Sequence, residues 1–300
     1  MDIVTEKRQF LPAGYIYAIL AAGFWAISGT FSKSLFNAGV TPLQLAQLRT
    51  TIAAVVLFFW LIISCPGALR VRRSDLGYFV ILGGTLAVSQ VTYLYAISKI
   101  KVAVAILMQY QAPVLIAIYS VFFARKSLSL FTIVAIATAV IGCYFVAGAY
   151  SQDILGMNSA GIISGLFSAV AFAVYSVRSD NVMRRYRSLT VVFYAVAFAA
   201  IIWNALQVPF SAFVQGYGMT EWGKIIFIGV FGTILPFGFY NKSIKCIGPA
   251  RAIITSTMEP VFAGLISYLF LGEKLEGLQV LGAGLVIMAI IILQLKKDSE

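Results

Sequence analysis

Two apolar stretches, QAPVLIAIYS at residues 111–120 and MEPVFAGLIS at residues 258–267, each carry a proline at their third position. Pro113 and Pro260 are 147 residues apart (260 minus 113). Sliding the chain along itself by this distance aligns further pairs without a gap: Gly14 with Gly161, Ala22 with Ala169, Ala26 with Ala173, Ala103 with Ala250 and Leu128 with Leu275. One constant offset over this length predicts an internal duplication.

The composition of the chain predicts a membrane protein. Apolar residues make up 61% of the 300 residues and charged residues 11%, and the mean hydropathy is +0.93. Soluble globular proteins have about 45–50% apolar and about 25% charged residues. A bilayer supplies an apolar environment for the surplus apolar surface, so an integral membrane protein is expected.

Ten stretches of the chain are long and apolar enough to cross a bilayer, which takes about 20 residues. They lie near residues 14–33, 43–64, 75–97, 102–124, 128–148, 157–178, 189–208, 222–243, 250–271 and 277–295. The predicted fold is therefore an all-α polytopic membrane protein with ten transmembrane helices.

The basic residues predict how these helices are oriented. With the N-terminus in the cytoplasm, fourteen Lys and Arg residues flank the spans on the cytoplasmic side. The basic residues on the opposite side are Lys33, Lys99, Lys101, Lys224 and Lys274. Short cytoplasmic loops carry an excess of Lys and Arg. Both termini are therefore expected in the cytoplasm, which requires an even number of spans.

Each half of the duplication holds five spans, so the second half must enter the membrane from the opposite side. Two inverted five-helix repeats with a site between them at the midplane are typical of secondary transporters. The expected division is a cytoplasmic N-terminus at 1–11, a first repeat at 12–148, a second repeat at 149–295 and a cytoplasmic tail at 296–300. A duplicated passive channel or membrane enzyme is the alternative.

Several kinds of chemistry are excluded by residues that the chain lacks. It has no histidine and no GxxxxGK[ST] loop, and its three cysteines lie far apart. Histidine-dependent catalysis, HExxH metal binding and an ATP-binding loop are therefore absent. Asp75, Asp153 and Asp180 fall at span ends, unlike the paired intramembrane aspartates of a protease. No enzyme, catalytic residue, metal or cofactor is expected, and the net charge of +11 reflects topology rather than nucleic-acid binding.

Three stretches resemble the EamA family of the drug/metabolite transporter superfamily: GFWAISGTFSK at 23–33, YAISKIKVAVAILMQYQAPVLIAIYS at 95–120, and MEPVFAGLISYLFLGEKLEGLQVLGAGLVIM at 258–288. The resemblance covers both halves of the chain. It implies ten helices in an inverted repeat and a central cavity lined by helices one, three, four, six, eight and nine. It also implies transport of amino acids or other small metabolites, most often export.

Together these features predict a secondary active exporter of amino acids or related compounds, working by alternating access in a bacterial-type inner membrane. A multidrug or nucleotide-sugar carrier is the alternative, and a passive channel is a further one. The expected partners are a small-molecule substrate, the lipid bilayer and, if transport is coupled to them, protons.

Glu259 is the deepest acidic residue in any predicted span. It directly precedes Pro260, which cannot donate a hydrogen bond to the Ser256 carbonyl, so the helix is expected to open there. A carboxyl group at this position can take up and release a proton as access alternates. The alternative is that Glu259 stabilises the freed backbone.

The first repeat has uncharged polar residues where the second has Glu259. These residues are Gln109 and Gln111. Pro113 has no N–H, so the Gln109 carbonyl loses its helical donor. Glutamine can bond a ligand amide or carboxylate. It can equally join neighbouring helices, so both interpretations stand.

Other polar and aromatic residues recur at helical spacing and are candidates for lining the cavity. These candidates are Trp25, Ser28, Gln47, Gln90, Tyr93, Tyr175 and Thr255. Tyr240, by contrast, lies near the end of its predicted span and fits the aromatic belt at the headgroups. Arg49 lies within the second span and is expected to extend its guanidinium to the membrane surface, with an internal partner or an anionic substrate group as alternatives.

Overall fold

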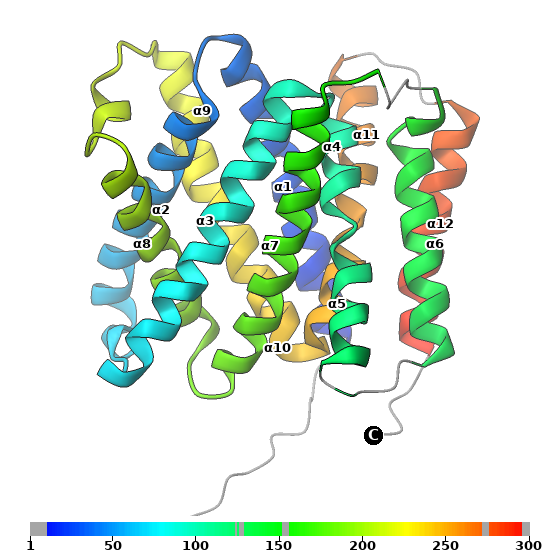
Figure 1. The fold of residues 1–300 in the computed structure, drawn as a ribbon, viewed down its shortest axis with the longest axis horizontal. Coiled ribbons are helices and arrows are strands. Elements are labelled where there is room, and N and C mark those ends of the chain that lie inside the picture. Colours follow the sequence, from blue (N-terminus) through cyan, green and yellow to red (C-terminus); the bar gives the residue numbers. More distant parts are fainter. Residues whose placement is uncertain (1–10, 124, 126–128, 152–155, 272–275, 296–300) are drawn as a thin grey trace, which may run out of the picture.

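The computed structural model describes residues 11–123, 125, 129–151, 156–271 and 276–295. The described residues form helices and no β-strand (Figure 1). The α-helices are α1 (Leu11–Asn37), α2 (Pro42–Ser64), α3 (Leu76–Lys99), α4 (Val102–Gln109), α5 (Ala112–Phe122), α6 (Leu130–Val146), α7 (Ser159–Met183), α8 (Ser188–Leu206), α9 (Met219–Gly229), α10 (Leu235–Ser256), α11 (Met258–Leu271) and α12 (Gly277–Leu295). Residues 1–10 of the expected N-terminal segment 1–11, and the expected tail 296–300, lie outside the described residues.

Eight helical segments of the described chain are long and apolar enough to cross a membrane. They are Pro12–Asn37, Pro42–Ser64, Arg73–Lys99, Val102–Phe122, Ser159–Met183, Ser188–Leu206, Met219–Ser256 and Gly277–Gln294. An all-helical, multi-pass arrangement is therefore confirmed. The other two predicted spans are not among these segments: α6 has 17 residues, and the predicted span 250–271 is divided between the end of α10 and the 14 residues of α11.

The boundary between the predicted eighth and ninth spans lies inside α10. Met219–Ser256 forms one segment of 38 residues, whose middle, Val230–Ile234, is a π-helix. Gly248 has φ 80° and ψ 163°, which is outside the helical region, and Pro249 follows it. A residue with a side chain rarely adopts such a positive φ, so glycine permits the break at this point. Two helices therefore meet at Gly248.

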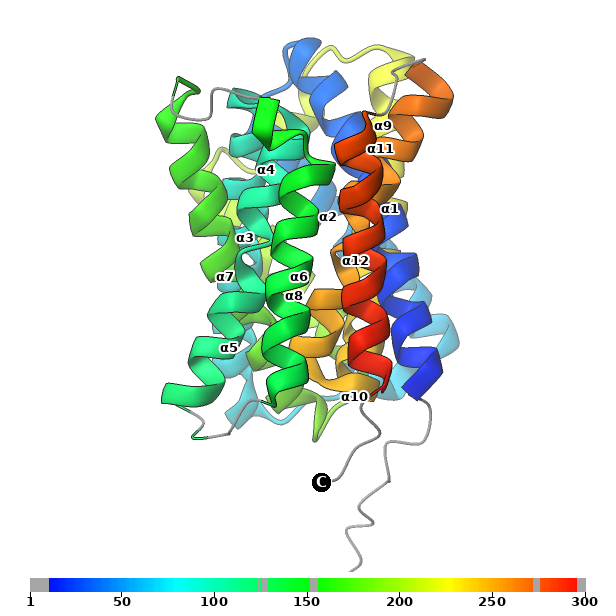
Figure 2. The same cartoon turned by 90° about the vertical axis from the view of Figure 1, so that its right-hand side faces the viewer.

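The helices form one upright bundle, and α6 and α12 stand side by side at its edge (Figures 1 and 2). Glycines let these two helices approach closely: a Cβ atom on Gly142 would lie 2.9 Å from the Gly282 carbonyl oxygen, and one on Gly282 would lie 2.6 Å from the Val146 nitrogen. Small residues at such crossings are how membrane helices gain packing contacts.

We call the end of the bundle where α1 begins and α12 ends the near end, and the opposite end the far end. The Tyr15 hydroxyl on α1 donates to the Leu293 carbonyl on α12 at 3.3 Å, which joins the two helices there. At the far end, the Lys33 ammonium near the end of α1 donates to the Ile97 carbonyl of α3 at 2.7 Å. The helix α3 therefore runs from the near end to the far end, parallel to α1.

The second half begins at the far end. A Cβ atom on Gly161, in the first turn of α7, would lie 2.9 Å from Ile100 Cγ2, just beyond the end of α3. At the other end of α7, the Tyr78 hydroxyl donates to the Arg178 carbonyl at 2.8 Å. The helix α7 therefore runs opposite to α1.

The outer surface of the bundle is apolar. Ile63, Phe122 and Leu130 are 83%, 74% and 73% exposed. In water such a surface would be an aggregation hazard, whereas the hydrocarbon of a bilayer covers it without cost.

Candidate functional site

The site is built where two helical segments are interrupted at matching positions. One interruption is at Tyr110 and Gln111, between α4 and α5. The other is at Thr257, between α10 and α11. Each begins three residues before a proline, Pro113 or Pro260, that has no N–H to donate to the preceding turn. The interruption leaves backbone groups available inside the bundle, as in the broken helices of transporters.

A small cavity of about 40 Å³ lies beside these interruptions. Its walls come from both halves of the chain. They consist of Trp25, Ser28, Gly29, Ser32, Arg49, Ser89, Gln90, Tyr93, Gln109, Tyr110, Phe172, Phe237 and Glu259. A cavity of this size has room for water molecules and is smaller than the 300–1,000 Å³ or so of typical ligand pockets. In this structure the cavity is therefore too small to hold a metabolite.

Glu259 is the acidic residue of the cavity, and its side chain is 2% exposed. The Tyr93 hydroxyl donates to its Oε1 atom at 3.0 Å, and the Tyr110 hydroxyl donates to its Oε2 atom at 2.9 Å. Among the described residues no Lys or Arg pairs with it within 4.0 Å. Two neutral donors therefore hold this buried carboxyl group.

Arg49 lies in the same cavity and is 4% exposed. Its Nε atom donates to Thr233 Oγ1 at 3.1 Å, and an Nη atom donates to the Gly232 carbonyl at 2.8 Å. Both partners belong to the π-helix, where Thr233 Oγ1 in turn donates to the Ile228 carbonyl. The expectation that Arg49 extends to the membrane surface is wrong, because its guanidinium is bound within the protein.

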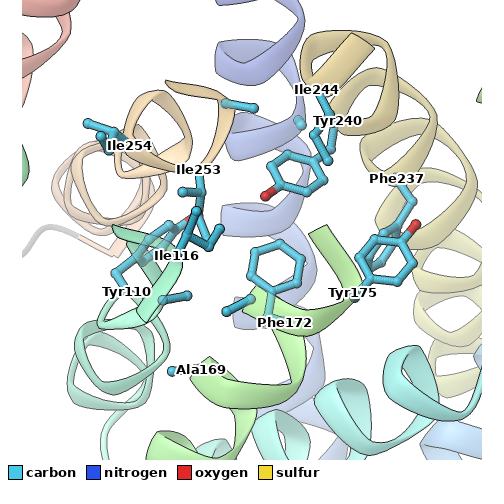
Figure 3. Close-up of a cluster of buried hydrophobic side chains, with 14 of the residues drawn as sticks. Tyr110, Ile116, Ala169, Phe172, Tyr175, Phe237, Tyr240, Ile244, Ile253 and Ile254 are labelled. Atoms are coloured by element: carbon cyan, nitrogen blue, oxygen red, sulfur yellow. The ribbon is translucent and has the colours of Figure 1, made fainter. Parts of the chain in front are cut away.

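Aromatic rings pack together at the cavity, and Figure 3 shows Phe172, Phe237 and Tyr240 among them. The Trp25 ring lies 5.7 Å from that of Phe172, 5.3 Å from Phe237 and 5.4 Å from Tyr240, between centroids. Phe172 and Tyr240 stack on one another at 5.1 Å. These rings supply the apolar wall against which part of a substrate can pack.

A hydrogen-bonded layer closes the cavity toward the near end. Ser176 Oγ and the Tyr240 hydroxyl lie 2.7 Å apart, and Asn241 Nδ2 donates to the Tyr175 hydroxyl at 2.7 Å. All four residues are completely buried. Tyr240 was expected in the headgroup belt, which is wrong: its ring faces the protein interior, because α10 continues well beyond the predicted span end.

Six of the ten residues predicted to line a cavity do so: Trp25, Ser28, Gln90, Tyr93, Gln109 and Glu259. The other four, Gln47, Gln111, Tyr175 and Thr255, do not line this cavity. The Gln47 amide bonds Asn204, Val208 and Ala212. Gln111 and Thr255 each donate to a carbonyl of their own helical segment.

Three cavity residues that the sequence interpretation missed could have been found from the duplication or from the matched prolines. Phe172 and Phe237 lie 147 residues after Trp25 and Gln90 (172 minus 25, and 237 minus 90). Tyr110 lies three residues before Pro113 and is the first residue of the interruption. Ser89 carries no comparable signal.

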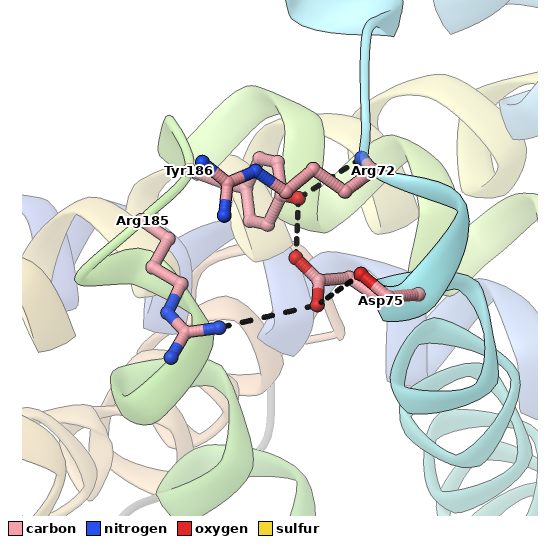
Figure 4. Close-up of polar contacts among 5 residues, drawn as sticks. Arg72, Asp75, Arg185 and Tyr186 are labelled. Carbon is pink, nitrogen blue, oxygen red and sulfur yellow. Dashed lines mark hydrogen bonds and ion pairs between the residues drawn. The ribbon is translucent and has the colours of Figure 1, made fainter.

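The two halves are also tied together at the near end, away from the cavity (Figure 4). The Tyr186 hydroxyl, on the connection after α7, donates to Asp75 Oδ2 at 2.6 Å and accepts from the Arg72 backbone N–H at 3.1 Å. The Arg185 guanidinium lies 3.9 Å from Asp75 Oδ1. These contacts join the α2–α3 and α7–α8 connections.

Comparison with known proteins identifies the class to which this fold and cavity belong. The sequence profile of the EamA-like transporter family matches residues 12–148 and again residues 159–295. The chain therefore belongs to the EamA-like transporter family and is a multi-pass membrane transporter.

Full-length relatives agree with this assignment. The uncharacterized inner membrane transporter YicL of Salmonella typhimurium is 27% identical over 94% of this chain and 95% of its own length. The threonine/homoserine exporter RhtA of Escherichia coli is 26% identical over 97% of this chain and 95% of its own length. A solved crystal structure that is 20% identical aligns with a TM-score of 0.74, over 95% of this chain and 96% of the other, which indicates a shared fold.

Proposed function

We propose that this protein is a secondary active exporter of amino acids or related small metabolites in a bacterial-type inner membrane. The observation that carries the proposal is the buried, charged cavity at two interrupted helices, with walls from both halves of the chain. Sites of this kind, at the midplane between repeats, are where alternating-access carriers bind their substrates. The similarity to a threonine/homoserine exporter supports the substrate class and the direction.

The proposal includes ten crossings in two inverted repeats, with domain limits at 12–148 and 149–295. Reciprocal contacts support it. A Cβ atom on Gly14 would meet Ile247 and Cys246, and one on Gly161 would meet Ile100 and Lys99. The two contacts are related by the repeat: Gly161, Ile247 and Cys246 lie 147 positions after Gly14, Ile100 and Lys99 (161 minus 14, 247 minus 100, 246 minus 99). Such exchange of partners is what a twofold relation between two halves produces.

The opposite directions of α1 and α7 support the inversion. Placing the near end in the cytoplasm brings the basic connections beside Asp75 to the cytoplasmic face, in accord with the excess of basic residues on that side. Both termini are then cytoplasmic, and the buried hydrogen bonds of Tyr175 and Tyr240 would close the cavity toward the cytoplasm.

Glu259 is the proposed proton-coupling residue. A buried carboxyl group held by two neutral hydroxyls, with no Lys or Arg of the described residues within 4.0 Å, can change its protonation state without breaking an ion pair. Protonation on one side of the membrane and release on the other would then link proton entry to substrate export. Its position next to an interruption places it where the helices can rearrange.

Uptake into inverted membrane vesicles tests this coupling. A pH gradient, acidic inside, is expected to drive threonine uptake by the wild type, and Glu259→Gln is expected to abolish the driven component. Glu276→Gln, on an exposed acidic residue at the start of α12, is the matched control and should transport normally. Unchanged transport and pH response in Glu259→Gln would refute the coupling role.

A multidrug carrier is the second candidate, because aromatic rings beside a single carboxyl group are suited to lipophilic cations. Arg49 in the same cavity opposes it, since a second cation would lie beside the guanidinium. A nucleotide-sugar carrier would need paired basic residues, and Arg49 is the only basic residue among the residues that line the described cavity.

A further inference from the structure

Two polar side chains of the central cavity, Arg49 and Gln90, have hydrogen-bonding capacity that no described residue uses. Arg49 has five N–H donors, and its hydrogen bonds to Thr233 and Gly232 use two of them. Gln90 is 4% exposed, and neither its amide nitrogen nor its amide oxygen has a partner among the described residues. Buried polar groups are normally paired, so an unpaired amide in a cavity wall points to a missing partner.

The cavity also contains one positive and one negative side chain that do not meet. Arg49 is held on one side by the π-helix between α9 and α10. Glu259 is held on the other by Tyr93 and Tyr110. In the described part of the chain the ion pair within 4.0 Å joins Arg185 to Asp75, not these two. Each buried charge thus keeps neutral partners and lacks an opposite charge.

A ligand that carries both charges would satisfy this arrangement. A carboxylate can accept from the free donors of Arg49 in the paired geometry that guanidinium groups favour. An ammonium group can donate to Glu259, and the Gln90 amide can bond either group of the ligand. Trp25, Phe172 and Phe237 would then contact the remaining apolar part.

We propose that Arg49 and Glu259 are the two poles of a site for the zwitterionic α-amino acid group, with Gln90 as a positioning contact. The inference rests on the proposed function, since it names how the exporter recognises its substrate. It requires both charged groups of the substrate, so an amine or an acid alone binds poorly. The cavity enlarges from its closed volume when the substrate enters.

The test uses three molecules that differ only in these groups: threonine, 1-amino-2-propanol, which lacks the carboxylate, and 2,3-dihydroxybutanoate, which lacks the amine. Each competes against labelled threonine in counterflow by purified wild-type protein in liposomes. Unlabelled threonine is expected to inhibit at least tenfold more strongly than either analogue. Equal inhibition by an analogue would overturn the zwitterion site while leaving the transport function standing.

Arg49→Gln and Arg49→Lys separate recognition from a purely structural role. Arg49→Gln should reduce the ratio of inhibition between threonine and 1-amino-2-propanol toward one, and Arg49→Lys should retain part of it. A structural role would lower activity without changing this ratio, which would overturn the assignment of Arg49. If Arg49→Gln does not fold, the wild-type analogue series still decides the proposal.

The twenty protein amino acids and homoserine are tested in the same liposomes. Counterflow by at least one of them, with the two-group requirement, is the expected result. If none is transported while lipophilic cations are, both the proposed function and the zwitterion site are wrong.

Discussion

Gln90 and Gln47 are two buried glutamines, and the structure predicts that substitution by leucine changes the stability of the protein in opposite directions at the two positions. Gln90 is 4% exposed and has no hydrogen-bond partner for either amide atom among the described residues. Leaving a buried polar group unpaired costs about 1–3 kcal/mol. Gln90→Leu replaces the amide by apolar atoms of similar size and should therefore stabilise the protein by roughly 2 kcal/mol. It should also reduce threonine transport, because the amide faces the proposed site.

Gln47 is fully buried, and its amide is paired. It donates to Asn204 Oδ1 at 3.0 Å and to the Val208 carbonyl at 3.2 Å, and it accepts from the Ala212 N–H at 3.0 Å. Each such bond contributes about 1 kcal/mol. Gln47→Leu removes these three bonds and a longer one from Ser211 Oγ at 3.5 Å, and it leaves the Ala212 N–H without this acceptor. A loss of roughly 3 kcal/mol is therefore expected.

Thermal unfolding of the purified variants in detergent measures both effects. At about 2–4 °C per kcal/mol, Gln90→Leu should raise Tm by roughly 4–8 °C. Gln47→Leu should lower it by roughly 6–12 °C. A Gln90→Leu protein that is no more stable than the wild type and transports at the wild-type rate would refute the inference that this amide awaits a ligand.

Three further substitutions test the helix packing and the hydrogen-bonded layer of Ser176 and Tyr240. Gly14→Ala and Gly161→Ala should each lower Tm by several degrees, because the added Cβ atoms would lie 2.6 and 2.9 Å from isoleucine methyl groups and overpacking costs about 1–3 kcal/mol. Gly223→Ala is the control and should leave Tm unchanged, since its Cβ atom would have nothing within 4 Å. Equal Tm values for all three variants would contradict the repeat packing. Tyr240→Phe removes the 2.7 Å contact with the α7 hydroxyl, worth about 1 kcal/mol. In a protein that also carries Ser28→Cys, Tyr240→Phe should increase thiol labelling at position 28 from the near end about fivefold. No increase would mean that the contact between Tyr240 and Ser176 does not hold the layer closed.

The membrane class, the all-helical fold and the family could be predicted from the sequence, because each depends on properties spread over the whole chain. Hydropathy and the matched prolines are such properties. Residue partners depend on helix rotation and depth, which hydropathy does not define. Arg49 illustrates this, since its partners lie on the π-helix, 183 and 184 residues away.

The same limit applies to individual polar residues of the site. Gln47 and Gln90 are both glutamines in apolar helices, yet one is fully paired within the protein and the other has no partner among the described residues. Their sequence contexts do not distinguish them. Tyr110 could have been chosen, because it lies three residues before Pro113, where the helix is expected to open.

Counterflow of labelled threonine in proteoliposomes tests the central claim, that this protein is an alternating-access carrier. Liposomes preloaded with unlabelled threonine should show a transient accumulation of label above equilibrium, and liposomes without preload should not. Uptake that rises only to equilibrium, at the same rate with and without preload, would show a channel and contradict the account.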